Sequence, residues 1–302
     1  MTPRQVQWYD DRFYKVPLPD VFKTEEDANT AATPHRKSGV TAYVVPAETG
    51  FAVDVYLPSV TTVLGVVGKP QLARWRGEVG NWEADRIMHE AQDRGSAIHH
   101  ACYTYINKGA VLLNPKYAPN YNREEIDAIA AEHNHLVAVL DAQEDFLQVL
   151  RFVRLLDLVK PEILGSEETL FSVSERVAGT MDQAWRIKGG SYAINGAKPL
   201  KLEEGIYIVD LKTGKSVDES YDMQIAAYAK MYEERGSEVR GGLLVHTNAQ
   251  TRTGIEGLAT RLTTREEIEE NYRDFSYTRE LWFRKYRQSP KVFDLPTILS
   301  IN

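Results

Sequence analysis

Three charged residues occupy positions at which two consecutive strands would bring their side chains together. Asp182 lies in the middle of one expected strand, Asp210 lies at the end of the next, and Lys212 follows two residues later. Side chains alternate between the faces of a strand, so Asp210 and Lys212 project from the same face. If the two strands are neighbours in a sheet, Asp182 lies beside them. The sequence therefore predicts a cluster of two carboxylates and one amine.

Such a cluster suits the hydrolysis of a phosphate ester. Carboxylate oxygens are ligands for Mg²⁺ or Mn²⁺, and such an ion polarises a phosphoryl oxygen and lowers the pKa of a bound water. Lys212 could orient that water or neutralise charge on the phosphate, and the carbonyl of Leu211 could add a ligand. Each residue alone fits a structural role equally well. The set is more specific, because the apolar run 206–209 indicates a strand buried on both faces.

Several other motifs are incomplete. The segment Gly214-Lys215-Ser216 matches the end of a phosphate-binding loop, but position 209 holds valine where that loop needs its first glycine. Cys102 is the single cysteine, so one chain can build neither an internal disulfide, nor a thiolate zinc site, nor an iron–sulfur cluster. These observations exclude all four of these features.

The first half of the chain is expected to be irregular and then helical. Residues 1–58 show no regular period apart from one expected hairpin through 43–45 and 51–53. From Pro58 to about Lys160 the chain is expected to be helical, and Pro161 ends the last helix. Apolar residues recur at helical spacing from Ile126 to Leu140, with His133 packed on the apolar face.

Beyond residue 160 the period changes to that of strands. We expect strands at 169–173, 178–187, 206–212 and 242–246. A helix is expected at 218–235, where Gly236 ends it, and a last helix is expected to begin at a capping box formed by Thr264–Glu267 and to end near Arg287. The chain is thus predicted to be an α/β protein in three segments. These are an extension at 1–57 without an assigned role, a helical region at 58–160, and an α/β core at 161–302.

Composition and charge set broad limits on the function. The chain has 302 residues and a net charge of −7. This net charge does not indicate nucleic-acid binding, but it does not exclude it either, because basic patches can be local. No apolar run reaches the roughly 18 to 20 residues that span a bilayer, and the first residues lack the apolar stretch of a signal peptide. We therefore expect a cytoplasmic protein without a membrane partner.

Five motifs in order resemble a known nuclease family. The segments 179–182, 210–214 and 224–228 (GTMD, DLKTG and QIAAY) resemble the PD-(D/E)xK nuclease superfamily. More narrowly, they are similar to its RecB-like exonuclease branch, which includes phage-encoded nucleases and the mitochondrial genome-maintenance exonuclease. The segment 94–99 (RGSAIH) is similar to the upstream histidine motif of that branch, and 58–64 followed by 72–75 resembles the opening of its helical region.

The resemblance implies a fold and a set of roles. The fold would be the central mixed sheet of that family, flanked by helices, with a helical N-terminal region that arches over the site. Asp182 and Asp210 would bind a metal, Lys212 would assist the attacking water, and His99 would approach a metal from the helical region. A glutamate on the preceding strand would complete the set, and by spacing it is Glu167, with Glu168 as the alternative because one residue's slip reverses the strand face.

Further residues are expected to support the site or to touch DNA. Gln224 and Tyr228 share one helix face, and the resemblance has them support the site, with ordinary packing as the alternative. The expected DNA contacts are Ser59, Thr61, Arg74, Trp75 and Arg94, from the matched motifs and a helical stretch in which basic and aromatic residues alternate. The last helix also carries basic and aromatic residues, among them Trp282, Arg284, Lys285 and Tyr286; there we favour a solvated amphipathic face.

The resemblance implies an Mg²⁺- or Mn²⁺-dependent DNA exonuclease without an iron–sulfur cluster. It would act on DNA ends or single-stranded DNA in replication, recombination or repair. A helicase, recombinase or single-strand-binding protein would be a separate chain, and a phage-encoded enzyme would work in the bacterial host cytoplasm. The alternatives are a structure-specific endonuclease on the same core, or a DNA-binding recombination accessory that has lost catalysis.

Overall fold

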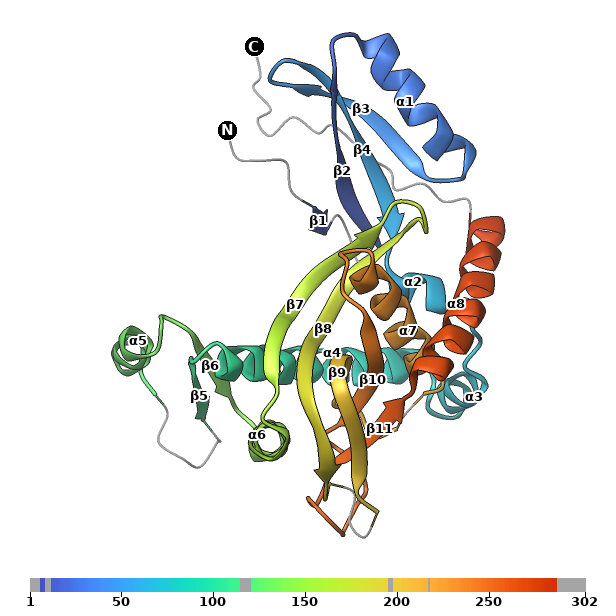
Figure 1. Cartoon of the computed structure of the whole chain (residues 1–302). Coiled ribbons are helices and arrows are strands. Elements are labelled where there is room, and N and C mark those ends of the chain that lie inside the picture. The colour runs from blue at the N-terminus through green and yellow to red at the C-terminus, as the bar shows by residue number, and fades with distance from the viewer. Residues whose placement is uncertain (1–5, 9–11, 115–120, 195–197, 217, 287–302) are drawn as a thin grey trace. The chain divides into compact units, whose positions relative to one another are not determined.

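The computed structural model shows a mixed α/β protein and describes residues 6–8, 12–114, 121–194, 198–216 and 218–286 (Figure 1). The chain divides into two compact units. Unit 1 comprises the described residues up to Val66, the segment Phe171–Gly179, and the described residues from Tyr277 onward; unit 2 comprises Val67–Leu170 and Thr180–Ser276. Among the described residues, no helix combines the length and the apolar character needed to cross a membrane.

Unit 2 is built on a five-stranded sheet with the order β11-β10-β9-β8-β7. The strands are β7 (Glu162–Ser172), β8 (Val177–Tyr192), β9 (Leu200–Lys212), β10 (Val239–His246) and β11 (Ala259–Thr263). The central strand β9 is parallel to β10 and antiparallel to β8, so the sheet is mixed. Tyr207, Ile208 and Val209 of β9 are all buried, as expected for a strand covered on both faces.

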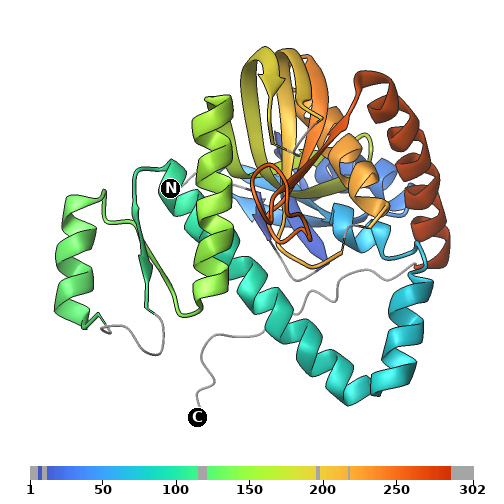
Figure 2. The same cartoon turned by 90° about the horizontal axis from the view of Figure 1, so that it is seen from below.

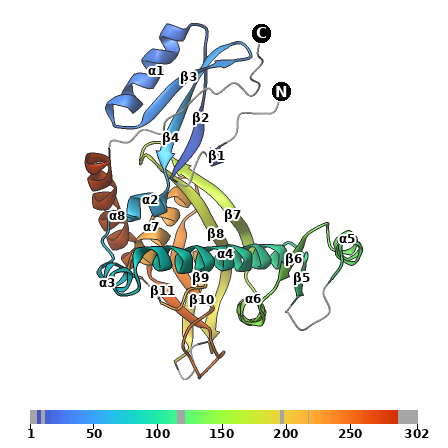
Figure 3. The ribbon, with the colours of Figure 1, turned by 180° about the vertical axis from the view of Figure 1, so that it is seen from behind.

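Helices cover both faces of this sheet. They are α4 (Asn81–Ile106) and α6 (Gln143–Val159) on one face and α7 (Ser220–Glu233) on the other. Helix α3 (Pro70–Val79) packs on α4, α5 (Arg123–Glu132) packs on the short strand Val137–Leu140, and α8 (Arg265–Lys285) follows β11. Ile98 of α4 and Phe152 of α6 share one apolar core with Val209 of β9; Figure 3 shows α4 running across the strands. On the opposite face α7 packs closely on β10, because a Cβ at Gly242 of β10 would lie 2.2 Å from Ile225 Cγ2 of α7. Figure 2 shows α6 and α7 on opposite sides of the strands.

Two predictions for the helical region were wrong. The segment 58–160 contains a parallel pair of short strands, β5 (Ala110–Leu113) and β6 (Val137–Leu140). The helix expected through 126–140 ends at Glu132, because Asn134 and His135 have φ angles of 52° and 59° that an α-helix cannot contain. His133 is the exposed C-cap of α5 and does not pack in a core.

Unit 1 contains an antiparallel sheet where the sequence suggested mostly irregular structure. Its strands are β1 (Gln7–Trp8), β2 (Phe13–Phe22), β3 (Thr41–Ala47) and β4 (Gly50–Pro58), in the order β1-β2-β4-β3, with the helices α1 (Glu25–Lys37) and α2 (Val60–Leu64). The β3–β4 hairpin confirms the one expected there, with Val44 opposite Val53. Helix α1 was missed; it packs through Ala28 and Ala32 on Val53 and Val55, but alanine is its only aliphatic residue type and Pro34 lies within it.

The elements beyond residue 160 follow the predicted order. Helix α6 ends at Val159, before Pro161, as predicted. Thr264 and Glu267 form the expected reciprocal capping box: the Thr264 amide donates to Glu267 Oε2 at 2.7 Å, and the Glu267 amide donates to Thr264 Oγ1 at 3.2 Å. Strand β11 was not predicted, and the expected helix end at Arg287 lies outside the described residues.

Candidate active site

Three side chains from separate elements of unit 2 converge on one point. His99 of α4, Glu167 of β7 and Asp182 of β8 each offer a ligand atom, and these atoms lie within 4.8 Å of one another. The Nδ1 atom of His99 is 3.5 Å from Glu167 Oε1 and 3.8 Å from Asp182 Oδ2. One imidazole and two carboxylates in this arrangement form a candidate centre for a divalent cation.

Helix α4 presents His99 because its apolar face is fixed elsewhere. Ile98, Ala101 and Cys102 are buried in the core of unit 2, and His99 lies just outside the sector of the helical wheel that these three residues occupy, so it turns to the side of that core. Gly95, one turn earlier, lets the helix approach the end of β9: a Cβ at Gly95 would lie only 3.2 Å from Thr213 Oγ1. A larger residue at position 95 would therefore require the Thr213 side chain to move.

An irregularity in β7 decides which glutamate joins the cluster. Glu167 has a φ of +49°, a conformation that interrupts the alternation of side chains along a strand. Its carboxylate faces His99, whereas Glu168 bonds the Arg235 guanidinium at 2.5 Å. The structure thus places Glu167 and not Glu168 at the cluster.

Pairing between β8 and β9 brings the two aspartates together. The paired register ends with Gln183 opposite Val209, so Asp182 and Asp210 are the next residues on their two strands. The Asp182 carboxylate also accepts a hydrogen bond at 2.7 Å from the amide of Leu211. That bond fixes the orientation of Asp182 from the backbone of the strand that carries Asp210.

Lys212 is held by three neighbours at the end of β9. Its Nζ atom donates to Asp210 Oδ1 at 3.0 Å and to Gln224 Oε1 at 3.3 Å, and it lies 4.4 Å from the centroid of the Tyr221 ring. Nζ is also 2.8 Å from Asp210 Oδ2. That oxygen is buried and, among the atoms that the structure describes, accepts no hydrogen bond of acceptable geometry.

Burial and close charges shift the protonation equilibria of the site. Burial alone would lower the pKa of His99, but the Asp182 charge and the hydrogen bond to Glu167 outweigh it and raise that pKa to about 9. Burial raises the pKa of Asp210, and the Lys212 charge opposes this rise. Burial would lower the pKa of Lys212, but the charge of Asp210 keeps it raised. The metal-free cluster therefore holds a proton on His99 at neutral pH.

The cluster opens into a cavity of about 770 Å³. Helix α4 supplies one wall, with residues including Gln92, Ser96 and Tyr103, and Thr213 and Tyr221 lie on the opposite wall. The volume lies within the range of ligand sites. Of the charged groups, His99, Glu167 and Lys212 line this cavity, so a group from solution can reach them.

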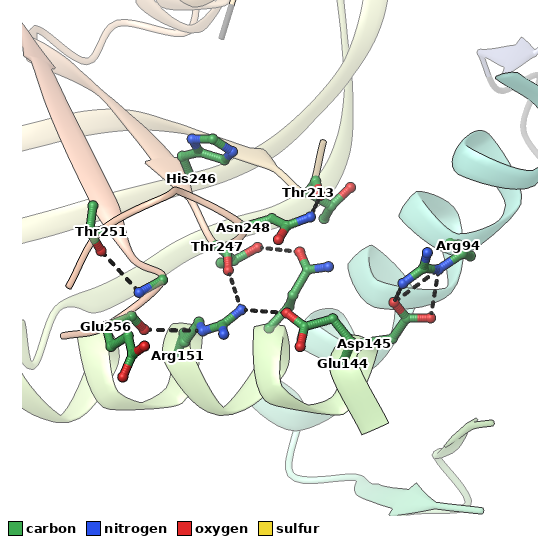
Figure 4. A network of polar contacts seen from close by, with 12 residues as sticks. Arg94, Glu144, Asp145, Arg151, Thr213, His246, Thr247, Asn248, Thr251 and Glu256 are labelled. Atoms are coloured by element: carbon green, nitrogen blue, oxygen red, sulfur yellow. Dashed lines mark hydrogen bonds and ion pairs between the residues drawn. The ribbon is translucent and has the colours of Figure 1, made fainter. Parts of the chain in front are cut away.

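A network of polar contacts fixes the segment that follows Lys212 (Figure 4). The amide of Thr247 donates to the Lys212 carbonyl at 3.0 Å, and the Thr247 hydroxyl donates to Gln148 Oε1 of α6 at 2.9 Å. Arg151 Nη1 donates to the Thr247 carbonyl at 2.9 Å, and Asn248 Nδ2 donates to the Thr213 carbonyl at 3.1 Å. Helix α6 therefore positions the end of β9 through the loop after β10.

The remaining residues predicted for the site have varied surroundings. Gln224 contacts Lys212 as described, whereas Tyr228, one turn later, is buried at 4% exposure. The Leu211 amide faces Asp182. Among the expected DNA contacts in unit 2, Arg94 is paired with Asp145 (Figure 4), Arg74 with Glu78, and Trp75 is partly buried.

Two expected DNA contacts lie in unit 1. Ser59 is buried and caps α2, with its Oγ atom accepting from the Thr62 amide at 3.0 Å, which is a structural role. Thr61 is exposed on the first turn of that helix.

Several residues at the site had not been selected from the sequence. Tyr221 was missed although it precedes Gln224 by three residues, which places it near the same helix face. Gln148, Thr247 and Asn248 carry no local signal, because Gln148 and Thr247 meet across 99 positions of the chain and Asn248 contacts Thr213 across 35 positions.

The sequence matches no protein-family model, and it shows no significant similarity to a curated protein. The geometry of the site therefore carries the functional argument.

Proposed function

We propose that the chain is a metal-dependent deoxyribonuclease of the PD-(D/E)xK type, acting as an exonuclease. One observation carries this proposal: His99, Glu167 and Asp182 converge beside an Asp210–Lys212 pair at the end of a buried strand, at the wall of an open cavity. A purely structural ion-pair cluster would not need an imidazole, three carboxylates and an amine from four elements around a solvent-accessible cavity.

The residues present fit a divalent cation. Three ligand atoms lie close enough to share one ion. Asp210 Oδ2 is buried 2.8 Å from the Lys212 amine, but it accepts no hydrogen bond of acceptable geometry within the described part of the chain. This carboxylate therefore keeps acceptor capacity that a hard divalent cation can use. A bound Mg²⁺ or Mn²⁺ would supply polarisation of a phosphoryl oxygen and a lower pKa for a coordinated water.

The amine of Lys212 is placed to act on the phosphate or on the attacking water. Asp210 and Gln224 hold its Nζ atom from two sides, and the Tyr221 ring lies against it. A fixed positive charge in a partly buried site stabilises negative charge that develops on a transferring phosphoryl group, without a reorganisation cost during the reaction. Gln224 is then a positioning residue, because it acts through Lys212.

The cavity favours a strand end over the interior of a closed duplex. Its volume of about 770 Å³ suits nucleotide-sized groups. Aromatic side chains of Tyr103 and Tyr221 line it, and such rings can stack on unpaired bases. These features support action on DNA ends or single-stranded DNA.

One experiment tests the proposal. Purified protein is incubated with linear and closed circular DNA, each single- and double-stranded, with Mg²⁺ or Mn²⁺, with excess chelator, and as the Asp210→Asn variant. We expect nucleotides to be released from linear DNA only, in a reaction that chelator and the variant both abolish. Cutting of closed circles would replace the exonuclease with an endonuclease. Absence of cleavage on every substrate would overturn the enzyme and leave a DNA-binding accessory.

A further inference from the structure

Unit 1 contains a second cavity, of about 690 Å³, with a strongly basic wall. It lies within that unit, among the end of α1, the turn into β3, the β7–β8 turn and the end of α8. Four cationic side chains line it: Arg36, Lys37, Arg176 and Arg284. Of the described residues in its wall, Glu280 alone is acidic.

Two of these cations hold the wall in place. Arg36 Nε donates to the Ala42 carbonyl at 2.9 Å, and its Nη1 atom donates to Asn29 Oδ1 at 3.1 Å. Arg176 Nη1 donates to the Ser38 carbonyl at 2.7 Å. Arg176 also forms an ion pair with Glu280 and lies 4.4 Å from the centroid of the Phe283 ring.

The other two cations, Lys37 and Arg284, are exposed. Neither forms an ion pair with any carboxylate in the described part of the chain. Nearby negative charge does not balance the four cations. The C-termini of α1 and α8 each carry roughly half a negative charge, so these two helix ends and Glu280 together offset about two of the four positive charges. In a chain of net charge −7, this excess marks a local site for an anion.

An aromatic ring stands beside the cations. Tyr43 lines the cavity and is 37% exposed, and its ring packs edge-on against Tyr56 with centroids 5.6 Å apart, which restrains the orientation of the ring. Positive charge next to a restrained aromatic face suits single-stranded nucleic acid, which offers phosphates and unpaired bases. An acidic peptide offers charge without a stacking partner for the ring.

We propose that this cavity is a contact site for single-stranded nucleic acid, in which Lys37 and Arg284 pair with backbone phosphates and Tyr43 stacks on a base. The site does not depend on the proposed cleavage chemistry, because all of its residues belong to unit 1 and the candidate active site belongs to unit 2. It also revises our interpretation of the last helix: Arg284 lines the cavity, whereas Lys285 does not.

The test is a binding titration with the full chain in excess chelator, so that its result is independent of cleavage. The probe is a short fluorescent single-stranded oligodeoxynucleotide, and fluorescence anisotropy reports binding over a range of salt concentrations. The pocket variant is Lys37→Gln with Arg284→Gln. The matched control is Lys23→Gln with Lys285→Gln, which removes the same charge from exposed positions of the same unit outside the cavity wall. Thermal melting verifies that both variants fold.

Loss of two phosphate contacts has a calculable effect. Each contact contributes about −0.7 to the slope of log K against log salt for single strands, so the slope should decrease in magnitude by about 1.4 in the pocket variant. At about 0.1 M salt this corresponds to an affinity roughly 25-fold lower. The control pair should bind like the unchanged protein, and Tyr43→Leu should weaken binding without changing the slope.

Three results would overturn the proposal. The first is unchanged affinity in the pocket variant, and the second is an equal loss in the control pair, which would indicate a general charge effect. The third is equally strong competition by polyglutamate at matched charge, which would show a site for any polyanion. Failure of cleavage in unit 2 would leave the binding result intact, so the two proposals fail independently.

Discussion

Replacement of Lys212 by methionine separates a catalytic amine from a docking amine. Methionine keeps much of the length of the side chain and removes its charge. Lys212 Nζ is 2.8 Å from Asp210 Oδ2, and at an effective dielectric constant of about 20 two unit charges at that distance attract by about 6 kcal/mol. One pKa unit corresponds to about 1.4 kcal/mol. Because burial already raises the pKa of Asp210, the metal-free variant should keep this carboxyl group protonated at pH 7.

The variant should therefore lose turnover and not affinity for DNA. Loss of one fixed charge at a developing oxyanion costs about 10²-fold or more in turnover, whereas one phosphate contact among several changes binding modestly. Metal binding should become steeper with pH, because Asp210 must first release its proton. The measurements are turnover at saturating DNA, oligonucleotide affinity in chelator, and metal titration at several pH values.

Lys215→Met is the matched control, because Lys215 is exposed in the loop that follows β9. It should leave turnover, DNA affinity and metal binding unchanged. If Lys212→Met instead binds DNA poorly but cleaves it at a normal rate once saturated, Lys212 is a docking residue, and the role assigned to its contact with Asp210 is incorrect.

Other perturbations test the rest of the site. Asp210→Asn should abolish cleavage and preserve the fold, because it removes the charge of a ligand at nearly constant size; near-normal turnover would refute the assignment. The pKa of His99 is about 9 in the metal-free protein, so metal binding must displace its proton. Apparent affinity for Mn²⁺ should therefore rise up to about tenfold per pH unit up to that pKa. Calorimetry in buffers of different ionisation enthalpy measures the proton released, and His99→Gln should reduce the pH dependence of the affinity. Thr247→Val should lower the free energy of unfolding by about 1–3 kcal/mol, because it leaves the buried Gln148 amide oxygen without its donor. It should also lower turnover at unchanged metal affinity. A loss of stability alone would restrict Thr247 to a structural role.

The sequence alone determined which residues share a face within a single element. Asp210 and Lys212 were predicted to project together from the end of a buried strand, and the strand period requires this wherever β9 packs. The capping box at Thr264 and the helix end before Pro161 were equally predictable, because each depends on a few consecutive residues.

Tertiary structure decided the features that depend on distant contacts. Glu167 and not Glu168 joins the cluster because Glu167 has a positive φ, and nothing in the local sequence predicts that conformation. The expected helix through 126–140 failed for a related reason: apolar spacing fits a helix, but the left-handed conformation of Asn134 and His135 redirects the chain into β6, where pairing with β5 replaces helical hydrogen bonds.

The convergence of His99 with the carboxylates was decided only by packing. A periodic pattern indicates which face of α4 is apolar, but it does not indicate the distance at which that helix crosses the strands. That distance depends on the close approach of Gly95 to Thr213 and on the core that α4, α6 and β9 share. Local periodicity is encoded within one element and can be read from consecutive residues. Contacts between elements are set by the summed packing of many residues far apart in the chain, and no short motif records that sum.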